Sequence, residues 1–150
     1  MIKKADFNII NIDDVMNIWL KSNIYVHNFI NQKYWYDNFE FVKKCILNSE
    51  VYIYYEENIV KSFVGVDCGY IAGIFTDDIF RGKGIGTELI KYLKNIYYTL
   101  ELNVYEKNQK ALNFYIKNDF YIKEKSFDKN TNEYEYKMEW KRAWYYERKN

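Results

Sequence analysis

The chain has 150 residues, which suits one domain with a sizeable hydrophobic core. Hydrophobic residues make up 49% of the sequence and charged residues 29%, the balance of a soluble globular protein. The net charge of +1 produces no overall field that would attract nucleic acid or an anionic membrane, so we expect neither as a partner.

The first half of the chain is predicted to form a strand, two helices and a run of short strands. Residues 2–10 fit the first strand. Asn11 can cap a helix whose apolar positions run from Val15 to Val26, and a second helix fits residues 34–47. Residues 51–76 read VYIYYEEN, VKSFVGVDCG and YIAGIFT, with turn-forming residues between the runs, which indicates a meander of hairpins.

The second half is predicted to alternate helices and strands. Residues 84–98 return to helical spacing, and LELNVY at 100–105 is typical of a strand. NQKALNFYIKN at 108–118 fits a helix, and strands follow at about 120–127 and 133–141. In the last strand, aromatic and apolar residues alternate with charged ones, which predicts one face in water.

The resulting element order is β-α-α-β-β-β-α-β-α-β-β, with no linker or internal repeat. It predicts a single α+β domain over residues 1–150, mostly antiparallel, with a crossover helix after a glycine-rich loop. Residues 141–150 form a tail that is either disordered or an additional element.

The two cysteines and the N-terminus bear on location. Cys45 and Cys68 lie far apart and match no metal-ligand spacing, so we expect free thiols and no metal. The opening MIKKADFNIINIDD lacks an apolar core of signal-peptide length, and no stretch approaches the length of a membrane span. We therefore expect a reducing, cytoplasmic setting.

A glycine-rich loop is the most informative local feature. Residues 81–87 read RGKGIGT and hold three of the chain's 6 glycines. Such a turn at the start of a helix presents backbone N–H groups outward, and the helix dipole adds positive charge there. Arg81 and Lys83 add full charges, and Thr87 adds a hydroxyl donor. The loop therefore predicts a ligand with several anionic oxygens, such as a pyrophosphate, against the alternative of a turn without function.

The common nucleotide motifs do not fit this loop. From Gly82 the chain reads G-K-G-I-G-T, with Thr where the dinucleotide fingerprint has its third glycine. That fingerprint also follows the first strand of a parallel repeat, whereas this loop follows several meander strands. The P-loop pattern G-x-x-x-x-G-K-[ST] is absent.

Two blocks of the sequence resemble the GCN5-related N-acetyltransferases (the GNAT superfamily). In IAGIFTDDIFRGKGIGTELI, the signature [Q/R]-x-x-G-x-[G/A] is met by Arg81, Gly84 and Gly86. In LELNVYEKNQKALNFYIKNDF, the pattern N-x-x-A-x-x-[F/L]-Y-x-x-x-G-F is met by Asn108, Ala111, Phe114, Tyr115 and Phe120, with Asp119 replacing the usual glycine. The resemblance covers about residues 1–127, and IWLKSNIYVHNFI is similar to a branch of small bacterial acetyltransferases.

The resemblance implies a mixed, mostly antiparallel seven-stranded sheet flanked by about four helices, splayed between strands 4 and 5. It implies acetyl-coenzyme A (acetyl-CoA) as donor and coenzyme A as product. The implied coenzyme-binding residues are Ile74, Phe75, Thr76, Arg81, Gly82, Lys83, Gly84, Ile85, Gly86, Thr87, Asn103, Asn108, Ala111, Phe114 and Tyr115. The pantetheine arm would pair with the backbone of 74–76, and the pyrophosphate would lie on the amides of 81–87.

The same resemblance implies Tyr115 as general acid beside the leaving sulfur, although one of 17 tyrosines could equally be a core aromatic. The base is left open. The fourth strand carries no carboxylate, and Asn103 cannot take a proton, so Asn103 is expected to position substrate or water. His27, the only histidine, could act as base, bond the acceptor or be structural, and ordered water is a further candidate for the base.

We therefore expect an acetyl-CoA-dependent N-acetyltransferase that moves an acetyl group to a primary amine of a small molecule or protein by direct attack. The alternative is a non-catalytic acyl-CoA-binding regulatory module on the same fold. Aromatic residues at 19–36 either line an acceptor pocket or form helix core. Monomer and homodimer are both compatible with the sequence.

Overall fold

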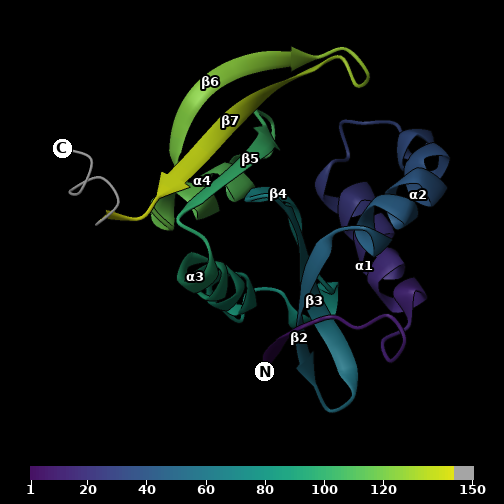
Figure 1. Cartoon of the computed structure of the whole chain (residues 1–150). Helices are drawn as coiled ribbons and strands as arrows, with labels where there is room; N and C mark the ends of the chain where they lie inside the picture. The colour runs from purple at the N-terminus through teal and green to yellow at the C-terminus, as the bar shows by residue number, and fades with distance from the viewer. Residues whose placement is uncertain (144–150) are drawn as a thin grey trace.

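The computed structural model describes residues 1–143, and within this range seven strands form one sheet (Figure 1). The elements are β1 (Ile2–Lys4), α1 (Ile12–Val26), α2 (Gln32–Leu47), β2 (Glu50–Glu56), β3 (Ile59–Asp67), β4 (Tyr70–Thr76), the 3-10 turn η1 (Asp78–Phe80), α3 (Ile85–Ile96), β5 (Thr99–Tyr105), α4 (Gln109–Lys117), β6 (Tyr121–Asp128) and β7 (Glu133–Lys141). The predicted α+β class and element order are confirmed. The tail expected at 141–150 overlaps the end of β7, and residues 144–150 lie outside the described range.

The first strand is shorter than the predicted 2–10, because the chain turns at Asp6. The Asp6 carboxylate accepts a hydrogen bond from the Asn8 backbone N–H at 3.0 Å. The Asp6 carbonyl accepts from the N–H groups of Ile9 and Ile10. An aspartate that bonds the backbone two residues ahead favours a turn over an extended chain. Ile10 is nevertheless buried, so the segment leads into α1 along the core.

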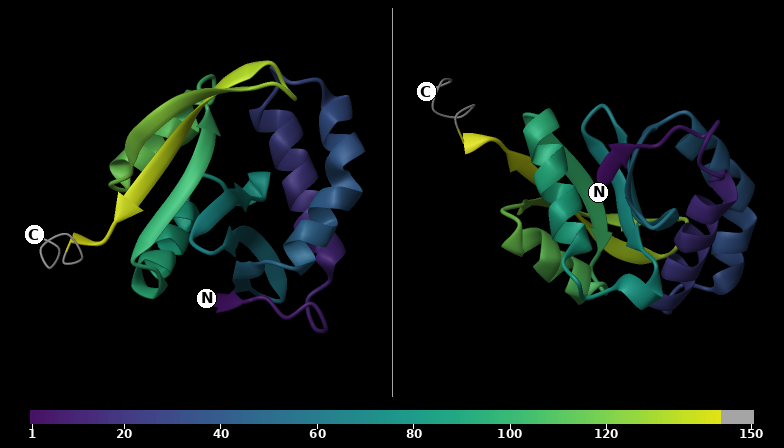
Figure 2. Two further views of the ribbon diagram at one scale, coloured as in Figure 1. Left: turned by 45° about the horizontal axis from the view of Figure 1, so that its top comes forward. Right: turned by 90° about the horizontal axis from the view of Figure 1, so that it is seen from below.

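The sheet order is β1-β2-β3-β4-β5-β7-β6, so the last strand is inserted between β5 and β6. Among the described strands, five of the six neighbouring pairs are antiparallel, and β4–β5 is the parallel pair. Figure 2 shows α1 and α2 on one side of the sheet and α3 and α4 on the other. The predicted crossover helix after the glycine loop is α3, which connects β4 to β5.

Each side of the sheet has its own hydrophobic cluster. On one side, α1 and α2 contribute Met16 and Trp35, which pack with Phe63 of β3. On the other side, Leu93 of α3 packs with Leu102 of β5 and with residues of α4 and β7. The helices are therefore fixed to opposite faces by apolar burial, the dominant favourable term in folding.

The parallel contact between β4 and β5 is short. Register pairs join Tyr70 to Glu101 and Ile71 to Leu102, and the two strands then separate. The separation follows a register shift in β3 and a glycine in β4, Gly73, at φ +151°. A Cβ on Gly73 would come within 2.5 Å of the Phe75 ring. The predicted splay between strands 4 and 5 is confirmed, and it leaves β4 beyond Ile71 without a described strand on that side.

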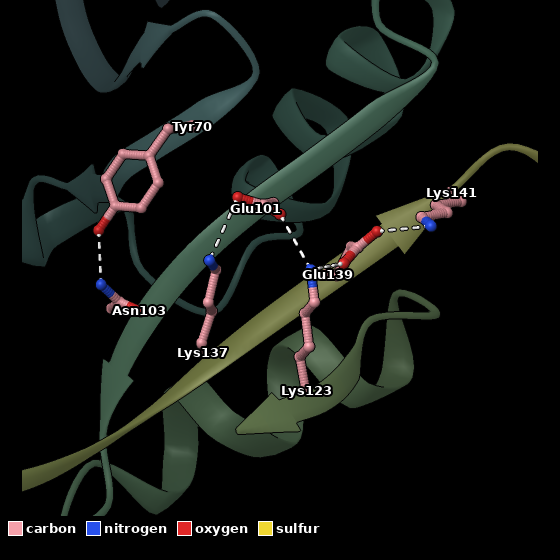
Figure 3. A network of polar contacts seen from close by, with 7 residues as sticks. All are labelled: Tyr70, Glu101, Asn103, Lys123, Lys137, Glu139 and Lys141. Carbon is pink, nitrogen blue, oxygen red and sulfur yellow. Dashed lines mark hydrogen bonds and ion pairs between the residues drawn. The ribbon is translucent and has the colours of Figure 1, made fainter. Parts of the chain in front are cut away.

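The face of β5, β7 and β6 opposite α3 and α4 is charged, and its ions are largely paired with one another (Figure 3). Lys123 contacts Glu139 at 3.0 Å and Glu101 at 3.6 Å. Lys141 contacts Glu139 at 3.2 Å, and Lys137 contacts Glu101 at 3.8 Å. Glu139 was expected on a face in water, but the lysine side chains cover it and leave only 3% of it exposed.

We expect Leu93→Ala to lower the free energy of unfolding by about 2–5 kcal/mol, because it leaves a cavity in a fully buried site. Ile96→Ala in the same helix, at a side chain that is 44% exposed, should change it by only about 0.5 kcal/mol. Urea unfolding monitored by circular dichroism measures both values. Equal effects of the two substitutions would contradict the core assignment.

Candidate active site

A cavity of about 390 Å³ opens where β4 and β5 separate. Its walls come from α1, the outer half of β4, the end of β5 and the start of α4. Of the residues expected to form a site, nine line it: His27, Ile74, Phe75, Thr76, Arg81, Asn103, Asn108, Ala111 and Tyr115. The structure thus brings together residues that are up to 88 positions apart in the chain, from His27 to Tyr115.

The remaining expected residues lie outside the cavity lining. Gly82, Lys83, Gly84, Gly86 and Thr87 belong to the loop and first turn of α3 beside the cavity. The Ile85 side chain is buried in the core and Phe114 packs against that core, so neither side chain is presented to the cavity.

Tyr115 projects from α4 and is buried to 7% exposure while it lines the cavity. Burial raises the pKa of its phenol above the usual 10, and the nearby Tyr70 raises the pKa further. A phenol with a raised pKa keeps its proton at neutral pH. Tyr115 therefore keeps its phenol proton at neutral pH in a buried wall of the cavity.

His27 follows the last turn of α1 and links two elements across the cavity. Its Nδ1 lies 2.9 Å from Oδ1 of Asn23, and its Nε2 lies 3.2 Å from Nδ2 of Asn108. Its ring stacks on Trp35 with centroids 5.5 Å apart. The link therefore ties the end of α1 to Asn108, the residue that caps α4.

The two asparagines fix the tautomer of this histidine. Asn23 donates its Nδ2 to the Trp19 carbonyl, which leaves its Oδ1 as the acceptor for an Nδ1–H of His27. Asn108 accepts the Ala111 N–H with its Oδ1, so its Nδ2 donates to Nε2 of His27. Both ring nitrogens are engaged, and burial lowers the pKa of His27 from 6.5 to about 4. This arrangement favours the structural role of His27 over that of a base or of a hydrogen bond to the acceptor.

Arg81 turns back toward α1 rather than out of the glycine loop. Its Nε donates to the Thr76 carbonyl at 3.2 Å, and its Nη2 donates to Oγ of Ser22 at 3.2 Å. Its guanidinium also lies 5.0 Å from the Tyr25 ring centroid. The side chain therefore joins α1 to the end of β4, and the charge that we expected to face a ligand is partly used in this contact.

The glycine loop leaves the first N–H groups of α3 open. Gly82 and Gly84 have φ of +74° and +81°, a region that side chains with a Cβ rarely adopt. Gly84 is the N-cap, and no side chain caps the helix. Because the first turn of a helix has no internal acceptors for its N–H groups, these donors remain available to a ligand.

The third glycine of the loop has a different structural reason. A Cβ on Gly86 would lie 3.2 Å from the Phe114 ring, which is closer than ordinary contact. Around Gly82 and Gly84, by contrast, an added Cβ meets nothing within 4 Å. Gly86 thus permits α3 and α4 to approach each other, while the other two glycines permit the backbone turn.

Sequence reasoning missed several cavity residues. Tyr70, Tyr105 and Glu135 all line the cavity. The alternation along β7 placed Glu135 on one face of a strand, but only the insertion of β7 beside β5 brings that face to the cavity. Of the aromatic residues expected at 19–36, Trp19 and Trp35 are buried and line the cavity as well, so they serve both core and pocket.

Within residues 1–143, no group of three or more metal-ligating side chains is close enough to hold an ion. In the same range, no helix combines the length and apolarity needed to cross a bilayer.

Asn103 of β5 donates its side-chain Nδ2 to the Tyr70 hydroxyl of β4 at 3.0 Å, and this hydrogen bond bridges the two diverging strands (Figure 3).

Comparison with known proteins gives concordant results. The sequence profile of the acetyltransferase (GNAT) family matches residues 12–120. Peptidyl-lysine N-acetyltransferase YiaC of Escherichia coli (strain K12) is 33% identical over 110 residues, which cover 72% of this chain and 75% of YiaC. Apo YjaB from Escherichia coli has a TM-score of 0.80 at 21% identity, over 93% of this chain and 95% of that chain. An aminoglycoside 6'-N-acetyltransferase complexed with coenzyme A has a TM-score of 0.72 at 13% identity, over 94% and 96%.

We expect the single histidine to stay neutral until about pH 4, as the Nδ1–H tautomer, because burial disfavours its charge. The unfolded chain, with a pKa of 6.5, then binds a proton that the folded chain does not. This histidine therefore makes the free energy of unfolding fall as the pH drops from about 6.5 to about 4. Nitrogen NMR of the ring measures both tautomer and pKa, and titration near 6.5 would contradict the hydrogen-bonded link.

Proposed function

This chain belongs to the acetyltransferase (GNAT) family and is an N-acetyltransferase, and we propose that it transfers the acetyl group of acetyl-CoA to the side-chain amine of a lysine in a protein or peptide. One observation carries the proposal. The separation of β4 from β5 opens a cavity that has unpaired β4 backbone on one wall and the Tyr115 phenol on another.

The residues present fit acetyl-CoA as donor. Helix α3 begins at Gly84, which has a left-handed backbone conformation, and no side chain caps the helix. Its first backbone N–H groups are therefore available as donors for the pyrophosphate. The edge of β4 at Ile74–Thr76 offers backbone for the pantetheine arm, because β5 no longer pairs there. Acetyl-CoA supplies an activated acetyl thioester. Structural relatives support the assignment, since one was solved with acetyl-CoA and another with coenzyme A.

Direct attack by the amine fits the placement of the cysteines. Cys45 and Cys68 are both exposed, one on α2 and one in the turn between β3 and β4, and neither lines the cavity. No cysteine thiol is available there to carry the acetyl group, which supports attack of the amine nitrogen itself on the thioester carbonyl carbon. The ammonium of the acceptor first loses a proton to ordered water, and a C–N bond then forms as the C–S bond breaks.

The side chains around the cavity divide the remaining tasks. Tyr115 gives its proton to the departing sulfur, for which its raised pKa keeps it protonated. Backbone N–H groups near Thr76 polarise the carbonyl. His27 holds Asn108 at the start of the helix that carries Tyr115, and so acts as a positioning residue.

A lysine side chain is favoured as the acceptor by the kinship with YiaC, which is named a peptidyl-lysine N-acetyltransferase. The likeness to the aminoglycoside enzyme, at 13% identity, does not identify the acceptor of this chain. The family assignment also favours an enzyme over the non-catalytic acyl-CoA-binding module that the sequence left as an alternative.

We expect Gly84→Val to abolish the rise in melting temperature that acetyl-CoA gives the unmodified protein, because a β-branched residue disfavours φ of +81° and obstructs the open amides. At about 100 times its Kd the ligand should add about 2.7 kcal/mol to stability. Thermal unfolding with acetyl-CoA, and with NADH as a negative control, measures the effect. Gly65→Ala, at a position where an added Cβ meets nothing, is the matched control and should keep the shift. An unchanged shift in a folded Gly84→Val protein would refute the loop assignment.

We expect Tyr115→Phe to lower kcat by about 10²-fold or more, because it removes the proton donor for the sulfur, while the thermal shift with acetyl-CoA persists. Tyr134→Phe, at an exposed tyrosine outside the cavity, should retain full activity. Steady-state release of coenzyme A with a lysine peptide measures both rates. Full activity of Tyr115→Phe would remove this residue from the mechanism.

A further inference from the structure

We propose that the Glu135 carboxylate binds the ammonium group of the acceptor amine and thereby selects cationic acceptors. The inference deepens the proposed acetyl transfer and rests on it for the identity of the reaction. It concerns a residue outside both sequence blocks that carry the family resemblance.

The strand order brings Glu135 to the cavity. Because β7 lies between β5 and β6, Glu135 is in register with Tyr105 on one side and Ser126 on the other. Strand alternation places it on the same face as Asn103 and Tyr105, which line the cavity with it. Among the described residues that line the cavity, Glu135 is the one acidic residue.

Three other acids on this face, Glu101, Glu133 and Glu139, contact lysines, but Glu135 does not. Lys123 contacts both Glu101 and Glu139 (Figure 3). Lys137 contacts Glu101, and Lys141 contacts Glu139. Glu133 contacts Lys107 at 3.0 Å. In the described part of the chain, the Glu135 carboxylate makes no hydrogen bond or ion pair. Lys137, the next residue on the same face, is directed to Glu101 instead.

The surroundings of Glu135 favour a cation. Asp128 lies close enough to raise the pKa of Glu135, after the larger effect of burial, and it accepts a hydrogen bond from the Tyr105 hydroxyl at 3.3 Å. The negative charge of Glu135 also contributes, after burial, to the raised pKa values of Tyr34 and Tyr70. A partly desolvated carboxylate without a partner gains most from a cationic ligand.

Aromatic rings complete the environment that an ammonium group would enter. Trp35, Tyr70 and Tyr105 line the same cavity, and ring faces attract cations. The single histidine of the cavity adds no competing positive charge at neutral pH, because its pKa is lowered to about 4. Arg81, the cavity's permanent cation, is already bonded to Thr76 at the end of β4 and to Ser22 of α1.

The test compares Glu135→Gln with Glu124→Gln, which alters an exposed carboxylate on β6 outside the cavity. Two probes are used, with coenzyme A present: a blocked peptide with one lysine, and the same peptide with an uncharged aminooxy group replacing the amine. Binding is followed by tryptophan fluorescence, since Trp19 and Trp35 line the cavity. Binding does not depend on turnover, so this readout is separate from the proposed reaction.

We expect Glu135→Gln to weaken binding of the lysine peptide by about tenfold or more, while Glu124→Gln leaves it unchanged. Binding of the aminooxy peptide should be equal in all three proteins. The proposal is overturned if Glu135→Gln binds the lysine peptide as the unmodified protein does, if it loses both peptides equally, or if the unmodified protein binds neither. Charge-dependent binding without any acetyl transfer would overturn the proposed reaction and leave the role of Glu135 intact.

Discussion

The cavity exists because the parallel contact between β4 and β5 is short. Two register pairs hold the strands together, and beyond Ile71 they diverge. Had the pairing continued, β5 would have occupied the β4 backbone and no cavity would exist. The divergence coincides with the register shift in β3 and with Gly73, the position at which a Cβ would strike Phe75. A local irregularity in two strands thus creates the space in which two substrates can meet.

Polar side chains connect the elements that surround the opening between β4 and β5. His27 joins Asn23 of α1 to Asn108 at the start of α4. Arg81 joins the end of β4 to Ser22 of α1. Ser22 and Asn23 are both buried, so loss of their partners would leave unsatisfied polar groups, which costs about 1–3 kcal/mol for each. These hydrogen bonds therefore hold the cavity walls in place, and the two that involve His27 also favour its neutral form.

The sequence predicted much of this because periodicity and motif spacing are local signals. The element order, the glycine loop and the N-x-x-A-x-x-F-Y block could all be read from neighbouring residues. The insertion of β7 beside β5 could not, because strand order is decided by long-range packing, and Glu135 was missed for that reason. The direction of the Arg81 side chain and the contact of Gly86 with Phe114 likewise depend on elements that are distant in sequence.

We propose that both substrates occupy this cavity together and that the amine attacks the thioester directly. Initial rates measured while acetyl-CoA and a lysine peptide are both varied test it most directly. We expect intersecting lines in double-reciprocal plots, because a ternary complex gives this pattern. Parallel lines, the pattern of a covalent acetyl-enzyme, would contradict it, as would the absence of any acetylated peptide.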